Sequence, residues 1–417
     1  MKKQYLILGF LLGCLQFAQA QFTLDGEFRP RTEYLNGFGT LIPDSAEPDF
    51  FTVTRARLNA GYSTESYKVY LSVQDILLWG ENPQIIHTDQ NNRFDLFQAW
   101  AELSLGGGWS TKLGRQVLSY DDQRILGGLD WAQQGRNHDA ALIKYSKDGF
   151  ALDFALAFNQ DNIGAPGNLY STTPLFSYKT MQMLHLNKKF STSFSGSLLA
   201  MNTGYQNGTP GVSNLQTIGT HLKYNKGSFG LAANAFIQTG ERQGGVEVKG
   251  AYDVSLDLSF KASDKVGLGA GVEVLSGNDA GAGETGAFFP LYGTNHKFNG
   301  FMDYFYVGNH GNTVGLVDIH ASANFKLGEK SSLMVQALNF RGEQELPSGE
   351  KSLGTEVDLV FKKTFNGGYT LVLGYSQMFA SDGMYELKGV TEAAAADIQN
   401  WGWAMLVIKP KFLNTAN

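Results

Sequence analysis

The sequence contains a single cysteine, Cys14, among its 417 residues, and only 10 prolines. Because Cys14 lies in an expected signal peptide, the mature chain has no thiol, which excludes a disulfide framework and cysteine chemistry. After Gln21 there is also no window of about 18 apolar residues, which argues against a membrane-spanning helix. An exported chain of this kind is either soluble or crosses a membrane with the strands of a closed barrel.

Motifs of catalysis and of metal binding are also missing from the sequence. The seven histidines show no pair with the i, i+4 spacing of a zinc site, and there is no Gly-x-Ser-x-Gly elbow. The formal net charge of -6 argues against a nucleic-acid partner. We therefore expect no enzyme, no metal site, no cofactor and no bound nucleic acid.

The first twenty residues have the pattern of a secretory signal peptide. Two lysines precede the apolar run 5–15, and Ala18-Gln19-Ala20 supplies an A-x-A cleavage site. The alternative is a lipoprotein processing site at 11–14. The leading interpretation assigns residues 1–20 to the signal peptide and residues 21–417 to one exported domain.

The mature chain is dominated by alternation of apolar and polar residues. Phe150, Leu152 and Phe154 alternate with Ala151 and Asp153, and such alternation over about ten residues predicts strands with one apolar face and one polar face. The same pattern recurs widely and predicts about eighteen strands, near residues 22–36, 50–62, 66–78, 95–105, 109–118, 138–146, 149–160, 177–188, 192–203, 216–225, 228–239, 246–260, 265–276, 313–327, 331–342, 353–363, 368–380 and 400–412.

The connections between these segments alternate between short and long. Short periplasmic turns and long extracellular loops, with an even strand count, are typical of an antiparallel up-and-down transmembrane β-barrel. The segment 298–307 is an ambiguous extra strand, and we assign it to a long loop. Aromatic residues near predicted strand ends suggest interfacial girdles: Tyr34, Trp79, Trp100, Trp109, Trp401 and Trp403.

If the apolar face meets lipid, arginines line the interior. A lipid-facing arginine at the bilayer midplane costs about 2–4 kcal/mol, which predicts that Arg29, Arg31, Arg55 and Arg57 point inward. Eight of the ten arginines fall between Arg29 and Arg136. Guanidinium groups bind carboxylates in a bidentate way, so this arc could guide an acidic solute, or it could form ion pairs that only solvate the wall.

Two long predicted loops stand out. The first, Ser119–Asn137, is rich in charge and could fold inward as a constriction, with Gly127-Gly128 permitting a tight turn. It could also neutralise its own arginines with Asp121, Asp122 and Asp130. The second, Gly277–Asn312, is interpreted as a surface lid.

The stretch 113–145 carries a family resemblance. Gly114-Arg115-Gln116, Asp122-Gln123-Arg124, Asp130-Trp131 and Asp139-Ala140 resemble the signature of the alginate export family of outer-membrane proteins. That resemblance implies an eighteen-stranded barrel whose arginine-lined pore passes an anionic polyuronate. It implies a pore-facing set made of Arg115, Asp122, Arg124, Asp130, Arg136 and Asp139. His138 and Asp121 depart from the pattern, where an aromatic residue and a glycine are common.

These observations together predict a passive channel in the bacterial outer membrane for anionic saccharides or small acidic solutes. Its partners would be outer-membrane lipid and the solute, and the sequence leaves any periplasmic partner unidentified. A general non-selective porin and an occluded structural or adhesive barrel remain as alternatives. The predicted pore-lining residues are Arg29, Arg31, Arg55, Arg57, Arg115, Asp122, Arg124, Asp130, Arg136 and Asp139.

Overall fold

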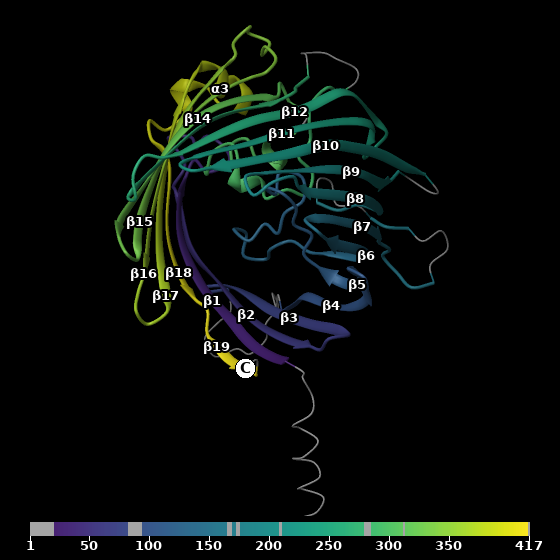
Figure 1. Cartoon of the computed structure of the whole chain (residues 1–417). Helices are drawn as coiled ribbons and strands as arrows, with labels where there is room; N and C mark the ends of the chain where they lie inside the picture. Colours follow the sequence, from purple (N-terminus) through teal and green to yellow (C-terminus); the bar gives the residue numbers. More distant parts are fainter. Residues whose placement is uncertain are drawn as a thin grey trace, which may run out of the picture.

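The computed structural model describes residues 21–81, 94–164, 169–171, 176–207, 211–278, 285–311 and 313–415. Their strands form one antiparallel sheet that closes into a barrel (Figure 1). The barrel has eighteen strands, so the predicted fold class is confirmed. The predicted signal peptide lies outside the described residues.

The strands follow the chain in order around the barrel. They are β1 (Gln21–Asn36), β2 (Asp49–Ser63), β3 (Tyr67–Leu78), β4 (Asp95–Gly106), β5 (Trp109–Gln116), β6 (His138–Lys147), β7 (Phe150–Phe158), β8 (Thr180–Lys189), β9 (Phe194–Gln206), β10 (Val212–Lys226), β11 (Phe229–Arg242), β12 (Val246–Lys261), β13 (Val266–Leu275), β14 (Leu316–Gly328), β15 (Ser331–Arg341), β16 (Ser352–Thr364), β17 (Tyr369–Ala380), β18 (Gln399–Ile408) and the short β19 (Lys411–Asn414).

The barrel closes where the first strand meets the last. One edge of β1 pairs with β2, and its other edge pairs with β18 and then with β19. Pro410, which has no N–H to donate to a ladder, separates β18 from β19, but both lie along β1. The two segments therefore act as one interrupted strand, and the ring has no free edge.

The two faces of the sheet differ as the alternation predicts. On β12, Val254 and Leu256 point outward and are 48% and 39% exposed, whereas Asp253 and Ser255 point inward and are 0% and 6% exposed. A sheet that is apolar outside and polar inside fits a lipid environment. The low exposure of the inward residues shows that part of the interior is filled.

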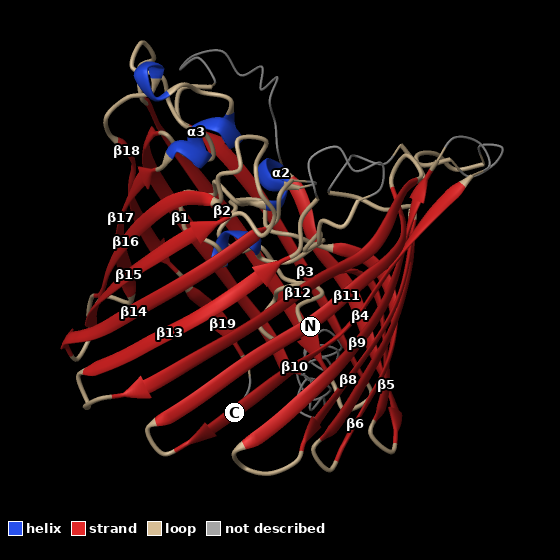
Figure 2. Ribbon diagram, turned by 90° about the horizontal axis from the view of Figure 1, so that it is seen from above, coloured by secondary structure: helices blue, strands red, loops and turns tan. Residues whose placement is uncertain are grey.

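The two ends of the barrel carry different connections (Figure 2). Hairpin turns join the strands at one end, and the longer loops with the helical segments α2 (Val307–His310), α3 (Asp382–Lys388) and η3 (Glu392–Ala394) lie at the other. A further short helical segment, η2 (Asn295–Lys297), belongs to the connection between β13 and β14. Two connections at the long-loop end, 207–211 and 243–245, are short, so the alternation is less strict than predicted. No helix of the described residues is long and apolar enough to span a membrane.

Several finer predictions can now be judged. Residues 298–307 form no strand, which confirms their assignment to a loop. Trp79 and Trp109 are 66% and 43% exposed, in keeping with an outer girdle, but Trp401 and Trp403 are 0% and 8% exposed. The girdle prediction was wrong for the last two, because their indoles pack inside the barrel against Trp131.

Candidate functional site

Two long connections fold into the barrel and pair with each other. The connection between β5 and β6 meets the connection between β13 and β14 through a parallel bridge of Leu126 with Tyr292. The N–H of Gly127 donates to the carbonyl of Tyr292 at 2.9 Å, and the N–H of Tyr292 donates to the carbonyl of Ile125 at 3.1 Å. The two loops therefore form one body inside the ring of strands, visible as coil within the barrel in Figure 1.

The second of these loops was predicted to be a surface lid, and that interpretation was wrong. Phe288, Leu291, Met302 and Tyr304 are each at most 4% exposed and belong to the hydrophobic core inside the barrel. The misleading signal was its polar, glycine-rich first part. The run of aromatic and aliphatic residues that follows needs burial, which the barrel interior provides.

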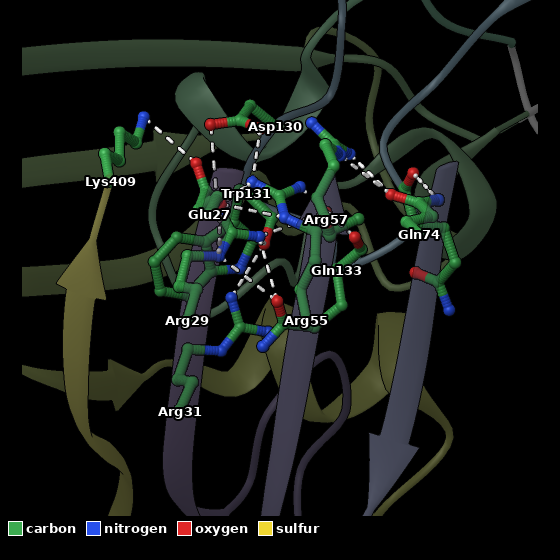
Figure 3. A network of polar contacts seen from close by, with 12 residues as sticks. Glu27, Arg29, Arg31, Arg55, Arg57, Gln74, Asp130, Trp131, Gln133 and Lys409 are labelled. Atoms are coloured by element: carbon green, nitrogen blue, oxygen red, sulfur yellow. Dashed lines mark hydrogen bonds and ion pairs between the residues drawn. The ribbon is translucent and has the colours of Figure 1, made fainter. Parts of the chain in front are cut away.

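Asp130 attaches the first loop to the wall formed by β1 and β2 (Figure 3). Its carboxylate accepts from the guanidinium of Arg55 at 2.8 Å and from that of Arg29 at 3.5 Å. Arg55 also donates to Glu27 at 2.9 Å, and Lys409 reaches the same glutamate at 3.0 Å. Arg29 and Arg55 of the wall thus share two carboxylates, that of Asp130 on the loop and that of Glu27 on the wall.

The residues after Asp130 extend this attachment. Arg31 donates to the main-chain carbonyl of Trp131 at 2.7 Å, and its guanidinium lies 4.0 Å from the centroid of the indole. The side chain of Gln133 accepts from Arg29 at 3.0 Å. The main chain of the loop is therefore held by the same arginines that bind its carboxylate.

This network changes the role of the predicted arginine arc. Arg29, Arg31 and Arg55 do lie inside the barrel, but they are 4%, 7% and 0% exposed, and each donates to the first loop. Arg57 lies beside them, donates to Gln74 at 2.6 Å and covers the ring of Phe97. The main role of the arginine arc is therefore to anchor the loop. Only the part of its surface that stays exposed to the lumen can contact a solute.

Asp130 differs from its partners because its side chain is 69% exposed to the lumen. Desolvation by burial raises its pKa, but the charges of Arg55 and Arg29 outweigh that effect and hold the pKa of Asp130 below its ordinary value. The carboxylate is therefore ionised at neutral pH and holds the two guanidinium groups through charge-assisted hydrogen bonds.

Arg124 makes the opposite attachment, from the loop to the far wall. Its side chain lies 3.2 Å from Asp253 and 2.8 Å from Glu273, and it donates to Asn299 of the second loop at 3.0 Å. Arg124 is 2% exposed and both carboxylates are also buried. One guanidinium therefore ties both loops to β12 and β13.

The loop is not neutralised by its own charges, as one alternative proposed. The carboxylate of Asp121 lies 3.1 Å from His185, and that of Asp122 accepts from Asn234 at 2.6 Å, both on the wall. Arg136 donates to the carbonyl of Gly293 at 2.7 Å. These side chains face the interior as predicted, but they join the loop to other elements.

Two of the predicted pore residues point the other way. Arg115 and Asp139 form a bidentate pair at 2.8 and 2.9 Å on the face of β5 and β6 that also carries Leu113 and Ile143, each 47% exposed. Side chains alternate along a strand, so it is the neighbouring His138 that faces the interior. The prediction that Arg115 and Asp139 line the pore was wrong.

Carboxylates of the wall also hold the second loop, although no local pattern in the sequence indicates this. Asn299 donates to Glu273 at 2.5 Å and to Asp318 at 3.1 Å. The N–H of Met302 donates to Glu356 at 2.8 Å. These partners are remote in sequence, so no local motif could have revealed them.

A cavity of about 570 Å³ lies against the inserted loops, on the side of β1, β16, β17 and β18. Its lining carries basic groups and aromatic rings: Arg29, Lys297, Lys362, Lys409, Trp131, His296, Phe301 and Trp403, with the carboxylates of Glu27 and Asp130. Gly374 leaves the space that the indole of Trp403 fills, because a Cβ there would lie 2.1 Å from the indole nitrogen.

A second cavity of about 370 Å³ lies on the side of β12 to β15. Its lining is mainly acidic and hydroxylic, with Asp122, Asp257, Glu273, Asp318, Ser255, Ser259 and Ser322, together with Lys297 and His320. These two cavities differ in charge, because the lining of the first has an excess of basic groups and the lining of the second has an excess of acidic groups.

A closed antiparallel barrel of eighteen strands with an apolar outer face defines an outer-membrane β-barrel protein, and solved structures share this fold. The chain resembles the outer membrane protein OpdK of Pseudomonas aeruginosa, with a TM-score of 0.63 at 12% identity, covering 94% of this chain and 99% of that one. It resembles OccAB4 of Acinetobacter baumannii, with a TM-score of 0.62 at 12% identity over 94% and 98% of the two chains. At this identity the likeness establishes the fold.

The family follows from the sequence itself. The family model described as alginate export matches residues 63–395, which is most of the chain. The chain belongs to the alginate export family and is a channel of the bacterial outer membrane. The comparison with curated protein sequences finds no match.

Proposed function

We propose that this channel passes anionic saccharides or small acidic solutes by passive diffusion. The observation that carries the proposal is the cavity of about 570 Å³ lined by basic groups and aromatic rings. Charged side chains that are partly open to water attract an anion without holding it, and a channel needs binding weak enough for release. Membership in the alginate export family supports the same class of solute.

The chemistry of this cavity suits an acidic sugar. Lys362 and Lys409 are exposed in it, and the side chain of Lys409 remains 63% exposed although it pairs with Glu27. Trp131 and Trp403 add aromatic surface, which packs well against the C–H faces of sugar rings. Arg29 also contributes positive charge to the lining of this cavity, but its guanidinium already donates to Asp130 and Gln133.

A general porin is the second candidate, and one observation favours it. The cavity of about 370 Å³ beside Asp257 and Asp318 carries acidic groups, which attract cations. If both cavities conduct, the effects of the basic lining and the acidic lining cancel, and the channel discriminates little between anions and cations.

The test is the reversal potential of single channels of the refolded protein in a salt gradient. We expect the reversal potential to show a preference for chloride over potassium, and we expect oligouronates to reduce the current. Equal permeability to both ions with no block would favour the general porin. A barrel that passes neither ions nor neutral sugars into liposomes would instead be an occluded structural barrel.

A further inference from the structure

Lys297 occupies an unusual position on the inserted loops. It ends η2, and within the segment 291–300 its neighbours are buried or half-buried while Lys297 is exposed. It lines the basic cavity and also the acidic cavity. Its charge therefore lies at the boundary between the two halves of the interior.

The charge of Lys297 is also less compensated than that of the buried arginines. Its Nζ donates to the main-chain carbonyl of Asp122 at 2.8 Å and lies 5.2 Å from the ring of Phe298. Among the described residues no carboxylate lies within ion-pair distance of it. By contrast Arg55 contacts two carboxylates, and so does Arg124. A cation that faces water without a paired anion acts on a passing ion over about a Debye length.

The charged groups around Lys297 make the sign of its own charge important for which ions enter. In the acidic cavity its opposing groups are Asp122, Asp257, Glu273 and Asp318, with His320 nearby. In the basic cavity it adds to the lysines of β16 and of the segment after β18. Removing this one charge leaves the acidic cavity without its lysine, while reversing it places a further acidic group on the lining of both cavities.

We propose that Lys297 sets the charge selectivity of the channel, and that the arginine arc does not. This inference deepens the proposed function, on which its expected direction rests. The lysine discourages cations from entering the acidic cavity and attracts anions into the basic one. The buried arginines act on selectivity only indirectly, by holding the loop that presents Lys297 to the lumen.

The experiment compares reversal potentials of the wild type with those of Lys297→Glu, Lys297→Gln and Lys297→Arg. The anion-to-cation permeability ratio should fall about 25-fold in Lys297→Gln, because one unit charge about 4 Å from an ion in water changes the partition of an anion about fivefold and that of a cation about fivefold in the opposite sense. It should fall further in Lys297→Glu and stay unchanged in Lys297→Arg. Lys330→Glu is the matched control, since Lys330 lies in the turn between β14 and β15 and lines neither cavity.

The outcomes separate this inference from the proposed function. If the wild type prefers anions and Lys297→Glu keeps that preference while retaining a strand-rich circular dichroism spectrum, the role of Lys297 is refuted. If the wild type shows no preference but Lys297→Glu prefers cations, the role of Lys297 stands and the anionic solute is refuted. An equal shift in Lys330→Glu would show that net charge alone matters, which also overturns the assignment.

Discussion

The two walls that hold the inserted loops use the same interaction with opposite signs. On β1 and β2 the wall supplies arginines, and the loop supplies Asp130. On β12 and β13 the wall supplies carboxylates, and the loop supplies Arg124. A segment with opposite charges at its two ends can cross the barrel in one orientation only. Interior charge on both walls of this barrel therefore serves to position a loop.

The two attachments differ in burial, which sets the order of expected effects. At the carboxylate wall every partner is buried, whereas at the arginine wall Asp130 remains 69% exposed. Burial strengthens the consequence of breaking a pair, because the charge left behind has no water to solvate it.

The largest effect is expected for Arg124→Met. The substitution leaves Asp253 and Glu273 buried without their shared cation, which should lower the free energy of unfolding by about 3–5 kcal/mol. Urea titrations in lipid vesicles measure this loss, and a larger single-channel conductance should accompany release of the loop. A loss no greater than that of a surface pair, about 1 kcal/mol or less, would show that the two walls do not differ as described.

A smaller effect is expected for Asp130→Asn. Arg55 keeps Glu27 as a partner, and the lost carboxylate is partly solvated, so the stability loss should be about 1–2 kcal/mol. The loop should nonetheless fluctuate, which recordings would show as open-channel noise. Quiet channels in this variant would mean that Trp131 and Gln133 hold the loop without Asp130.

Acid should reproduce that loosening in the wild type. The pKa of Asp130 lies below its ordinary value of 3.8, so the unfolded or detached state binds the proton more readily. The attachment therefore contributes fully above pH 3.8 and is lost as the pH falls through the lower folded value. Channel noise recorded between pH 7 and pH 3 should rise only at the acidic end, and Asp130→Asn should remove that pH dependence.

The smallest effect is expected for Arg115→Ala. This arginine pairs with Asp139 on the outer face, and its side chain is 35% exposed, so the pair should contribute about 0–1 kcal/mol. Stability and ion selectivity should both stay close to those of the wild type. A changed selectivity would restore Arg115 to the set of pore residues.

The strands were predictable because their signal is local. Predicted segment 353–363 is observed as Ser352–Thr364, and predicted segment 246–260 as Val246–Lys261. Alternation reports one apolar and one polar face, and a barrel in lipid needs both along every strand. The same logic placed Arg29, Arg31 and Arg55 inside, where the structure has them.

The contents of the barrel were not predictable in the same way. Arg124 and Asn299 are 175 positions apart, yet one hydrogen bond joins them, and no periodicity encodes such a contact. Trp401 and Trp403 were assigned to a girdle because they fall near a predicted strand end. They face inward because the loop offers Trp131 as an apolar partner, which only the folded loop reveals.

The closure of the ring along β1 has a consequence for how the chain folds. The N–H of Phe22 donates to the hydroxyl of Thr415 at 2.8 Å, across a separation of 393 positions. Contacts that join the two ends of a chain incur the largest loop-closure entropy and form slowly. Until the last strand arrives, β1 presents an open edge that could pair with another chain. A chain cut short before β18 would leave this edge of β1 unpaired and would be prone to aggregate.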